Sequence, residues 1–498
     1  MKYAKRLLSL LLVFAIALPL ISGCGDTASK TEAETSALKT ENTVEVTTDP
    51  NDRSGYKDSL PEDLDFGGMT IGVLSSASFG GKFIEGPEEL SGEIVQDTIY
   101  ERNEAVSQRL NVKLNIIVSN VSYDGTGNEI KKFVLAGDNT YDYAVAQQFG
   151  LITTVVDGIY YNFLNLPYID LSQPWWCNSY MDEIAIGNDK RFFFFGDYTA
   201  HMLYVAMVLF INKTMYENII GNPDEIYAKA LEGNWTMDAM EQLVKSCYSD
   251  LNGDGAVTVD DQFGFVTYYA SSSTDAFAFA TDIHLTERDN NGTLQFTMGT
   301  ERQIKAAELI NKIFWNQGSY VHLQEENITV DMFRGGRALM LGNNTLGSTY
   351  VLREMEDEYG ILPYPKLDEL QENYRTVVHD CASIGVVPIN CAHPEQTGAV
   401  LEAMNSESWK YVIPAWYETA LKIKYVRDNV SAQMIDIIRD SITTEFAYVY
   451  ASKLDNAGKI FRTLTQKKSN DFASEWAKIQ NGAENKLEKL YEAYIVNN

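Results

Sequence analysis

Apolar and polar positions follow two patterns along this chain, runs of strand length and segments with helical spacing. Residues 205–211 form an unbroken apolar run, which is typical of a strand buried on both faces. Asn212 ends this run, and residues 213–219 place apolar side chains at helical spacing. Residues 221–223 break that helix, and Thr236 is suited to cap the next one. The order of strand, helix, turn and capped helix predicts an α/β unit.

The same alternation fills the rest of the chain. Before this unit, the pattern predicts strands over 69–74, 112–116 and 141–146 and helices over 94–110 and 129–136. After it, the pattern predicts strands over 263–268 and 384–388, a helix running into a strand over 332–341, and helices over 301–315, 414–417, 434–439, 471–477 and 484–494. The β-α-β order of the first part is typical of an α/β fold.

The N-terminus carries an export signal. Three basic residues precede a short apolar segment over 7–18, and Ile21-Ser-Gly-Cys24 resembles a bacterial lipobox, in which the peptide is cut before the cysteine. We therefore expect a signal peptide over 1–23 and a diacylglycerol on Cys24. Residues 24–63 contain few large apolar side chains and predict a disordered tether. The protein is then exported and lipid-anchored to the outer face of the bacterial cytoplasmic membrane.

Length and charge narrow the possibilities further. A chain of 498 residues is long enough for two or three domains. Its formal net charge of -29, with no run of Lys and Arg, argues against a nucleic-acid partner. We expect a monomer.

Apart from Cys24, the cysteines are Cys177, Cys247, Cys381 and Cys391. Their spacing is not that of a metal site, so two alternatives stay open: free thiols or one disulfide.

Residues 250–261 match the spacing of a calcium-binding loop. The expected ligands are Asp250, Asn252, Asp254, the carbonyl of Ala256, Thr258 and Asp261. Two departures matter: the twelfth position is Asp instead of Glu, and a strand is predicted where a second helix would follow. We therefore expect a structural Ca²⁺ and not a sensor. The alternative left open is an Asp/Asn/Gly turn without a metal ion.

Two adjacent indoles, Trp175 and Trp176, stand in a loop that begins with a proline. Exposed indoles are costly unless they pack or bind, and flat aromatic faces stack well on the C–H faces of sugars. Because adjacent residues rarely share one role, we expect one ring in the core and the other in a ligand-binding cleft.

The order of several motifs resembles one family. An apolar strand precedes Asn212-Lys213, a helix follows, and Trp235-Thr236 opens the next helix. Residues 332–341 read MFRGGRALML, and residues 359–366 read YGILPYPK. This series resembles the family 1 extracellular solute-binding proteins, the sugar-capturing components of ABC importers, over most of residues 69–498.

The resemblance implies a two-lobed α/β fold of the type II periplasmic-binding-protein class, with two or three hinge strands between the lobes. Lobe 1 would contain residues 64–204 and 378–440, and lobe 2 would contain residues 205–377 and 441–498. The protein would capture a carbohydrate, which we interpret as an oligosaccharide, by closing its lobes around it. It would then deliver the sugar to the membrane permease subunits of an ABC transporter.

The expected ligand-binding residues combine amides, a carboxylate and aromatic rings. Gln147 and Gln148 follow a predicted strand, and ligands of α/β proteins bind beyond the carboxyl ends of strands. Asn343 lies in the loop that faces ligand in the resembling family, and Asp380 lies in an expected hinge strand. The complete set is Gln147, Gln148, Trp175, Trp176, Asn343, Asp380, Trp416 and Tyr417.

Enzyme motifs do not occur in the sequence. It contains no H-E-x-x-H pattern, no G-x-S-x-G elbow and no P-loop. His379 and Asp380 are adjacent, and adjacent strand residues point to opposite faces, so they do not form a catalytic dyad. We therefore expect a binding protein that is not an enzyme. The open alternatives are a peptide-binding ABC receptor, a carbohydrate-active enzyme, and a surface adhesion lipoprotein, although no internal repeat supports the last.

Overall fold

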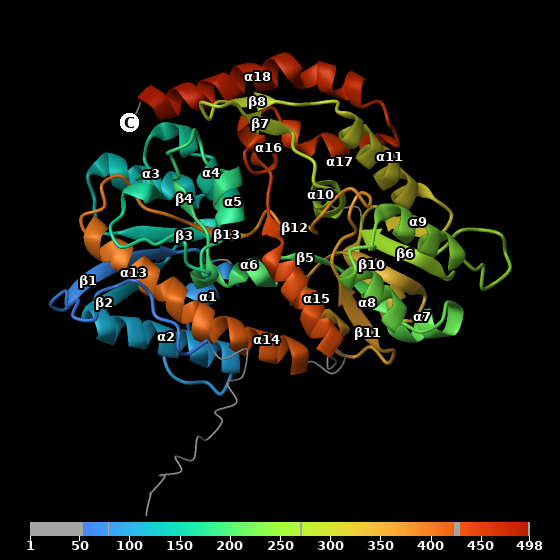
Figure 1. The fold of residues 1–498 in the computed structure, drawn as a ribbon, viewed down its shortest axis with the longest axis horizontal. Coiled ribbons are helices and arrows are strands. Elements are labelled where there is room, and N and C mark those ends of the chain that lie inside the picture. Colours follow the sequence, from blue (N-terminus) through green and yellow to red (C-terminus); the bar gives the residue numbers. More distant parts are fainter. Residues whose placement is uncertain (1–52, 78, 269–270, 423–428, 497–498) are drawn as a thin grey trace, which may run out of the picture. The chain divides into compact units, whose positions relative to one another are not determined.

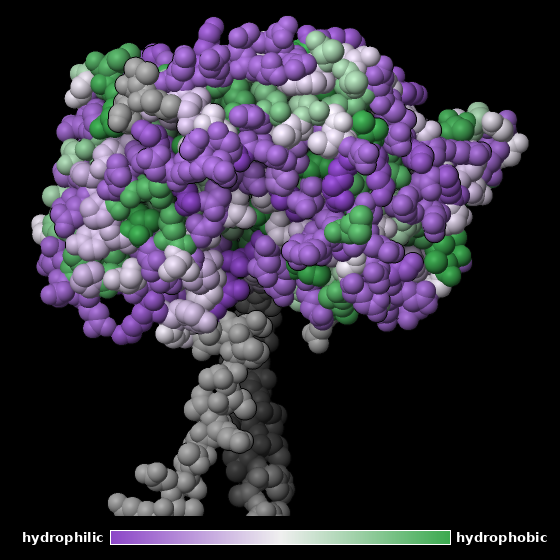
Figure 2. Space-filling view, turned by 45° about the horizontal axis from the view of Figure 1, so that its top comes forward, coloured by the Kyte–Doolittle hydropathy of each residue, from purple (hydrophilic) through white to green (hydrophobic). Residues whose placement is uncertain are grey.

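A computed structural model describes residues 53–77, 79–268, 271–422 and 429–496. Cys24, the expected signal peptide and most of the expected tether lie outside these ranges. Within them, none of the helices combines the length and the apolar character needed to cross a bilayer. Hydrophilic residues predominate on the face drawn in Figure 2, where hydrophobic residues form separate small areas.

The first lobe is built on a five-stranded sheet in the order β2-β1-β3-β13-β4 (Figure 1). β1 pairs in parallel with β2 and β3, whereas β13 runs antiparallel to β3 and β4. The strands are β1 (Met69–Ser75), β2 (Val112–Val118), β3 (Tyr143–Gln147), β4 (Phe193–Phe194) and β13 (Ser383–Val386). The helices are α1 (Lys82–Glu85), α2 (Ile94–Leu110), α3 (Thr126–Ala136), α4 (Gln148–Ile152), α5 (Asn178–Glu183), α6 (His201–Tyr204), α13 (Pro394–Glu407) and α14 (Ile413–Lys422).

The second lobe has a sheet in the order β11-β5-β10-β6-β9. β10, β6 and β9 are parallel to one another, and β5 is antiparallel to its neighbours. The strands are β5 (Met207–Asn212), β6 (Phe263–Tyr268), β9 (Ser319–His322), β10 (Ala338–Thr345) and β11 (Tyr359–Leu362), with a separate hairpin of β7 (Thr286–Arg288) and β8 (Leu294–Phe296). The helices are α7 (Lys213–Ile219), α8 (Asp224–Leu231), α9 (Met237–Ser246), α10 (Ser271–Ala280), α11 (Glu301–Trp315), α12 (Glu326–Arg334), α16 (Phe446–Val449) and α17 (Ile460–Lys467).

The central unit predicted from the sequence is confirmed. Every residue of β5 is buried, as its continuous apolar run requires. The side chain of Asn212 accepts a hydrogen bond from the Met215 N–H and caps α7, and Thr236 caps α9 in the same way. The buried indole of Trp235 donates to the carbonyl of Pro363, which joins this unit to the segment after β11.

Three chain segments cross between the lobes side by side. β12 (Thr376–Val377) pairs in parallel with β14 (Ile442–Thr443), and Ala206 forms a bridge with Val378. The expectation of two or three hinge strands is therefore confirmed, with one crossing before β5, one before β13 and one before α16.

The terminal segments differ from the sequence prediction. Two helices were expected over 471–477 and 484–494, but α18 (Phe472–Val496) is one continuous helix. Gly482 lies between the two expected helices, and it lets the Asp455 side chain approach the helix where a Cβ would overlap it. α18 contacts the short helix at Val155–Asp157 in lobe 1 and also β8 (Figure 1).

Residues near two of the expected domain boundaries make contacts that the sequence did not predict. Residues 53–63 were assigned to the tether, yet Arg109 of α2 donates two hydrogen bonds to the carboxylate of Asp58, and Leu60 is buried. The chain is therefore held against lobe 1 from these residues onward. α15 (Asn429–Asp440), which was assigned to lobe 1, contacts α8 and β11 of lobe 2, and its Arg439 also pairs with Asp197 of lobe 1, so the lobe boundary stays a prediction.

We expect the substitution Gly385→Ala to destabilise lobe 1 by about 1 to 3 kcal/mol, because a Cβ on this buried β13 residue would overlap the Phe194 ring. Gly55→Ala is the matched control, since a Cβ there has no atom of the protein within 4 Å. The midpoint of urea-induced unfolding measures both variants. Equal losses in the two variants would contradict this account of the packing.

A buried carboxylate also organises lobe 1. Both indoles of the Trp175–Trp176 pair donate to Glu402 of α13, each over 3.0 Å, and the Asp170 N–H donates over 3.2 Å. Burial raises the pKa of Glu402 to about 7, and these three N–H donors oppose that rise. Glu402 is thus a proton-binding group inside the folded lobe.

We expect Glu402→Gln to lose part of the pH dependence of folding stability. The folded-state pKa of Glu402, about 7, lies above the unfolded value of about 4.3, so the folded protein binds more protons between these values. The free energy of unfolding of the wild type therefore falls as pH rises through this window, by roughly 3 kcal/mol from this group.

Urea unfolding at about pH 5 and about pH 7.5 measures this difference. Glu308→Gln, which changes an exposed carboxylate on α11, serves as the control and should keep the wild-type pH dependence. If Glu402→Gln also kept it, Glu402 would be ionised throughout the window and the prediction would be wrong.

Candidate ligand-binding site

The carboxyl ends of the strands in lobe 1 bring together residues from distant parts of the chain. Gln147 ends β3 and is partly exposed, and the N–H of Gln148 donates to Ala382 just before β13. His201 Nδ1 lies 3.1 Å from the hydroxyl of Ser383. Burial lowers the pKa of His201 to about 4, so this imidazole is neutral at pH 7. The Gln148 side chain is buried and accepts from the Tyr180 hydroxyl, so it points into lobe 1.

In lobe 2, a break in β10 shapes the corresponding edge. The pairing of β10 with β5 shifts between Leu341 and Asn344, and Asn343 takes a left-handed conformation with φ of 59°. The Asn343 side chain accepts from the Ser272 hydroxyl over 2.7 Å and donates to Glu326 over 3.4 Å. The bulge therefore holds an amide group at the carboxyl end of the central strand.

A charged cluster lies beside the crossing segment that leads into β13, near the strand ends of the two lobes. Nδ1 of His379 is 3.1 Å from Asp380, and Arg462 of α17 binds Asp275 through two nitrogens and lies 3.9 Å from Asp380. Burial lowers the pKa of His379, but hydrogen bonding with Asp380 and Cys381 outweighs it and raises the pKa to about 10. The cations His379 and Arg462 therefore each have a carboxylate partner.

The sequence-based prediction did not include two exposed aromatic residues at the edge of lobe 1. Tyr123, in the loop after β2, is 56% exposed, and Phe149, just after β3, is 37% exposed. Their ring centroids are 6.2 Å apart. Both follow the carboxyl end of a predicted strand, so applying the strand-end rule to aromatic residues would have found them. They offer the apolar faces that the indoles were expected to supply.

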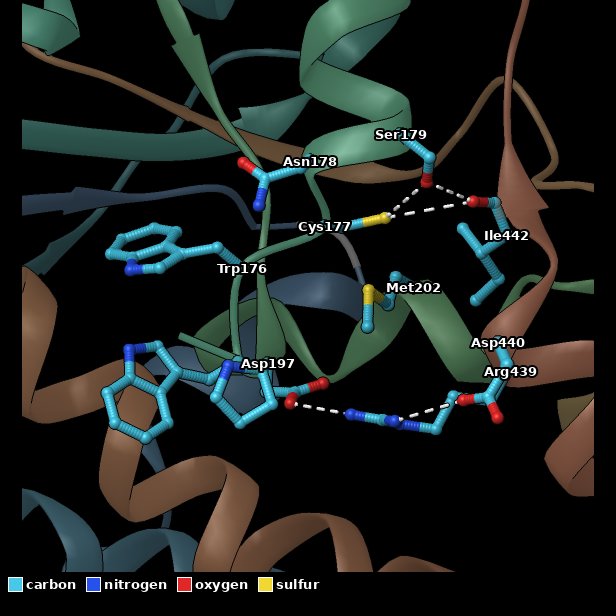
Figure 3. Close-up of a pocket in the computed structure, with 11 residues that line it drawn as sticks. Trp176, Cys177, Asn178, Ser179, Asp197, Met202, Arg439, Asp440 and Ile442 are labelled. Atoms are coloured by element: carbon cyan, nitrogen blue, oxygen red, sulfur yellow. Dashed lines mark hydrogen bonds and ion pairs between the residues drawn. The ribbon is translucent and has the colours of Figure 1, made fainter. Parts of the chain in front are cut away.

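Trp175 and Trp176 have an interior position instead. They are 1% and 5% exposed, and both are held by Glu402, so neither indole is exposed at the strand ends, and contact of one ring with a ligand stays a prediction. They form part of the wall of a different pocket of about 390 Å³, which lies between α5, α6 and β14 (Figure 3).

Trp416 and Tyr417 lie on α14, away from the strand ends. Trp416 is buried, and its ring meets that of Tyr417 at a centroid distance of 6.1 Å. Tyr417 has a buried hydroxyl without a hydrogen-bond partner among the described residues. The structure thus brings Gln147, Asn343 and Asp380 to the strand ends and leaves Trp416 and Tyr417 in helix packing.

The expected calcium loop joins α9 to β6. Asp250 accepts the N–H groups of Gly253 and Gly255, and the buried Asp261 accepts those of Leu251 and Thr258. Within the described ranges, no three His, Cys, Asp or Glu side chains are grouped so that they could hold a metal ion. In this conformation the carboxylates accept hydrogen bonds from the backbone of the loop itself, and calcium binding stays a prediction.

The cysteine alternatives are decided in favour of free thiols. Cys177, Cys247, Cys381 and Cys391 are all unpaired with one another in the structure. Cys391 lies near Asp142, and burial raises the pKa of its thiol to about 11. The thiol of Cys391 is therefore protonated at neutral pH.

No protein-family model matches the chain, and no curated protein matches it. Three solved structures are similar in fold. An ABC-transporter solute-binding protein from Thermotoga lettingae TMO, bound with α-D-tagatose, is 13% identical with a TM-score of 0.50, covering 85% of this chain and 100% of that one. The galacto-N-biose/lacto-N-biose I-binding protein of Bifidobacterium longum, in complex with lacto-N-biose, is 11% identical with a TM-score of 0.53, covering 86% and 98%.

The third is UgpB from Mycobacterium tuberculosis in complex with glycerophosphocholine, which is 13% identical with a TM-score of 0.50, covering 81% of this chain and 98% of that one. Structural similarity at such low sequence identity shows the fold and leaves the ligand open. This chain has the two-lobed α/β fold of ABC-transporter solute-binding proteins.

Proposed function

We propose that this protein is a non-enzymatic receptor that captures a carbohydrate at the facing strand ends of its two lobes. The supporting observation is the chemistry gathered there: the amides of Gln147 and Asn343, and the exposed rings of Tyr123 and Phe149. Amides both donate to and accept from hydroxyl groups, and aromatic faces pack against sugar C–H groups. Lobe closure would complete these contacts and stabilise the closed state.

The charges at the site favour a neutral ligand over a phosphodiester. Unpaired cations strengthen the binding of a phosphate group, whereas Arg462 is bound to Asp275 and His379 to Asp380. A glycerophosphodiester such as the one bound by UgpB would compete with these carboxylates for Arg462 and His379. A sugar needs no such exchange, since its hydroxyls bind the amides.

The remaining parts of the proposal concern the setting of the receptor. We propose that Cys24 is lipidated, that the body is held at the outer face of the cytoplasmic membrane, and that ABC permease subunits receive the sugar. The similar structures from T. lettingae and B. longum are described as ABC-transporter proteins, which supports this role. A peptide ligand is the main alternative.

A ligand panel tests the function. We expect one or more neutral mono- or oligosaccharides to raise the unfolding midpoint of the purified protein, while glycerophosphocholine and short peptides leave it unchanged. A ligand at a hundredfold excess over its Kd adds about 2.7 kcal/mol of stability, which a thermal scan detects. A shift with peptides alone would favour the peptide receptor, and loss of sugar during the assay would show catalysis.

Substitutions test the location of the site. We expect Tyr123→Ala and Phe149→Ala each to weaken binding of the identified sugar about fivefold to tenfold, because each removes a stacking face worth about 1 kcal/mol. Leu135→Ala is the matched control, since Leu135 is 75% exposed on α3 of the same lobe. Isothermal titration calorimetry measures the Kd values. Wild-type affinity in both aromatic variants would place the site elsewhere.

A further inference from the structure

The last residue of α5 meets a charged cluster of lobe 2 beside the β7–β8 hairpin. Oε1 of Glu183, in lobe 1, lies 3.8 Å from Nδ1 of His284 and 3.8 Å from Nη2 of Arg375. In lobe 2, Oδ1 of Asp282 lies 3.6 Å from Nε2 of His284 and 3.0 Å from Nη1 of Arg375. The imidazole of His284 therefore stands between two carboxylates, one from each lobe, with one ring nitrogen directed to each.

Lobe 2 holds the backbone on both sides of this imidazole. The buried side chain of Gln303, on α11, donates to the carbonyl of His284 over 2.7 Å. The buried carboxylate of Glu445 accepts the N–H groups of Leu285 and Thr286, each over 3.1 Å. The position of His284 is thus set within lobe 2, and its distance to Glu183 depends on where lobe 1 lies.

The charges of the cluster favour a proton on His284. Arg375 supplies one positive charge against the carboxylates of Glu183 and Asp282, so negative charge is in excess while the imidazole is neutral. Asp282 raises the pKa of His284, burial lowers it, and Glu183 raises it again. Arg375 opposes this rise and Glu445 adds to it, and the pKa is raised overall. The contact with His284 lowers the pKa of Asp282, which is therefore ionised where the imidazole titrates.

Proton binding and lobe contact are coupled in both directions. Whatever Glu183 adds to the affinity of His284 for a proton, the proton adds equally to the attachment of Glu183. We propose that His284 is a proton-dependent clasp between the lobes, which is tight when the imidazole is protonated and loosens when the proton leaves. The clasp lies beside the hairpin, so it does not depend on which ligand the strand ends bind.

The direction of the pH effect follows from the raised pKa of His284. The contribution of the clasp is complete below the ordinary value of about 6.5 and is lost as pH rises through the raised, folded-state value. The side chains of His284 and Glu183 are 36% and 28% exposed, so we expect a modest effect that salt weakens.

An NMR titration of the purified full-length protein, without any ligand, tests the clasp. The ring ε1 C–H signal of His284 is identified by its loss in His284→Gln. We expect a wild-type midpoint above about 6.5, which Glu183→Gln lowers by roughly half a pH unit. Glu101→Gln removes an exposed carboxylate on α2 of the same lobe and should leave the midpoint unchanged. A midpoint that Glu183→Gln does not lower would overturn the proposal.

Hydrogen exchange of the backbone amides over 285–296 reports on the lobe contact itself. The wild type, Glu183→Gln, His284→Gln and the double variant are compared about one pH unit below the His284 midpoint and about one unit above it. This cycle isolates the pair from other titrating groups such as Glu445. We expect the two losses of protection to be non-additive below the midpoint and additive above it. The same additivity at both pH values would overturn the proposal. Unfolding midpoints confirm that each variant is folded, and His284→Asn replaces His284→Gln if the latter is unstable.

Discussion

The backbone pairing of the crossing segments fixes where both sheets present their strand ends. The crossing before β13 leads into a strand antiparallel to β3, so Ser383 pairs with Gln147 at the carboxyl end of β3. The crossing before β5 likewise leads into a strand antiparallel to β10, and Met207 pairs with Thr345. Because each crossing enters its sheet antiparallel to the neighbouring strand, the carboxyl ends in both lobes lie at the crossing. The candidate site follows from this arrangement.

Local signals explain what the sequence could predict. The apolar run of β5, the cap Asn212 and the cap Thr236 act over a few residues, so the order of β5, α7 and α9 was readable from the chain. The strand-end rule placed Gln147 for the same reason, whereas Asn343 was named from the family resemblance. Hydrogen bonds between residues far apart in sequence could not be predicted. Glu402, for example, accepts from two indoles that lie about 230 positions before it. Nothing near the Trp pair signals that a carboxylate will bury it.

Gln148 and Asp380 show how tertiary partners decide a side chain's role. The sequence places both near a strand end, but the hydroxyl of Tyr180 draws Gln148 into lobe 1. Asp380 stays partly exposed, and its neighbours His379 and Arg462 come from the adjacent position and from α17. A doublet such as Gln147–Gln148 thus contributes one group to the edge and one to the core, because adjacent residues at the end of a strand point in different directions.

Contacts around the hairpin limit how the lobes can move. Arg288 of β7 donates to the carbonyls of Asp182, Glu183 and Ala185, which end α5 in lobe 1. All three contacts use Nη2 of Arg288, whose two N–H groups form at most two full hydrogen bonds at a time; a hydrogen bond from a charged donor is worth about 1.5 to 3 kcal/mol, so a motion that breaks these contacts is disfavoured. α18 adds contacts to both lobes. We expect a closing motion that keeps these bonds to pivot on the side of the molecule where Arg288 lies. Lobe closure on a ligand is therefore compatible with a hinge that stays fixed on the side of α18.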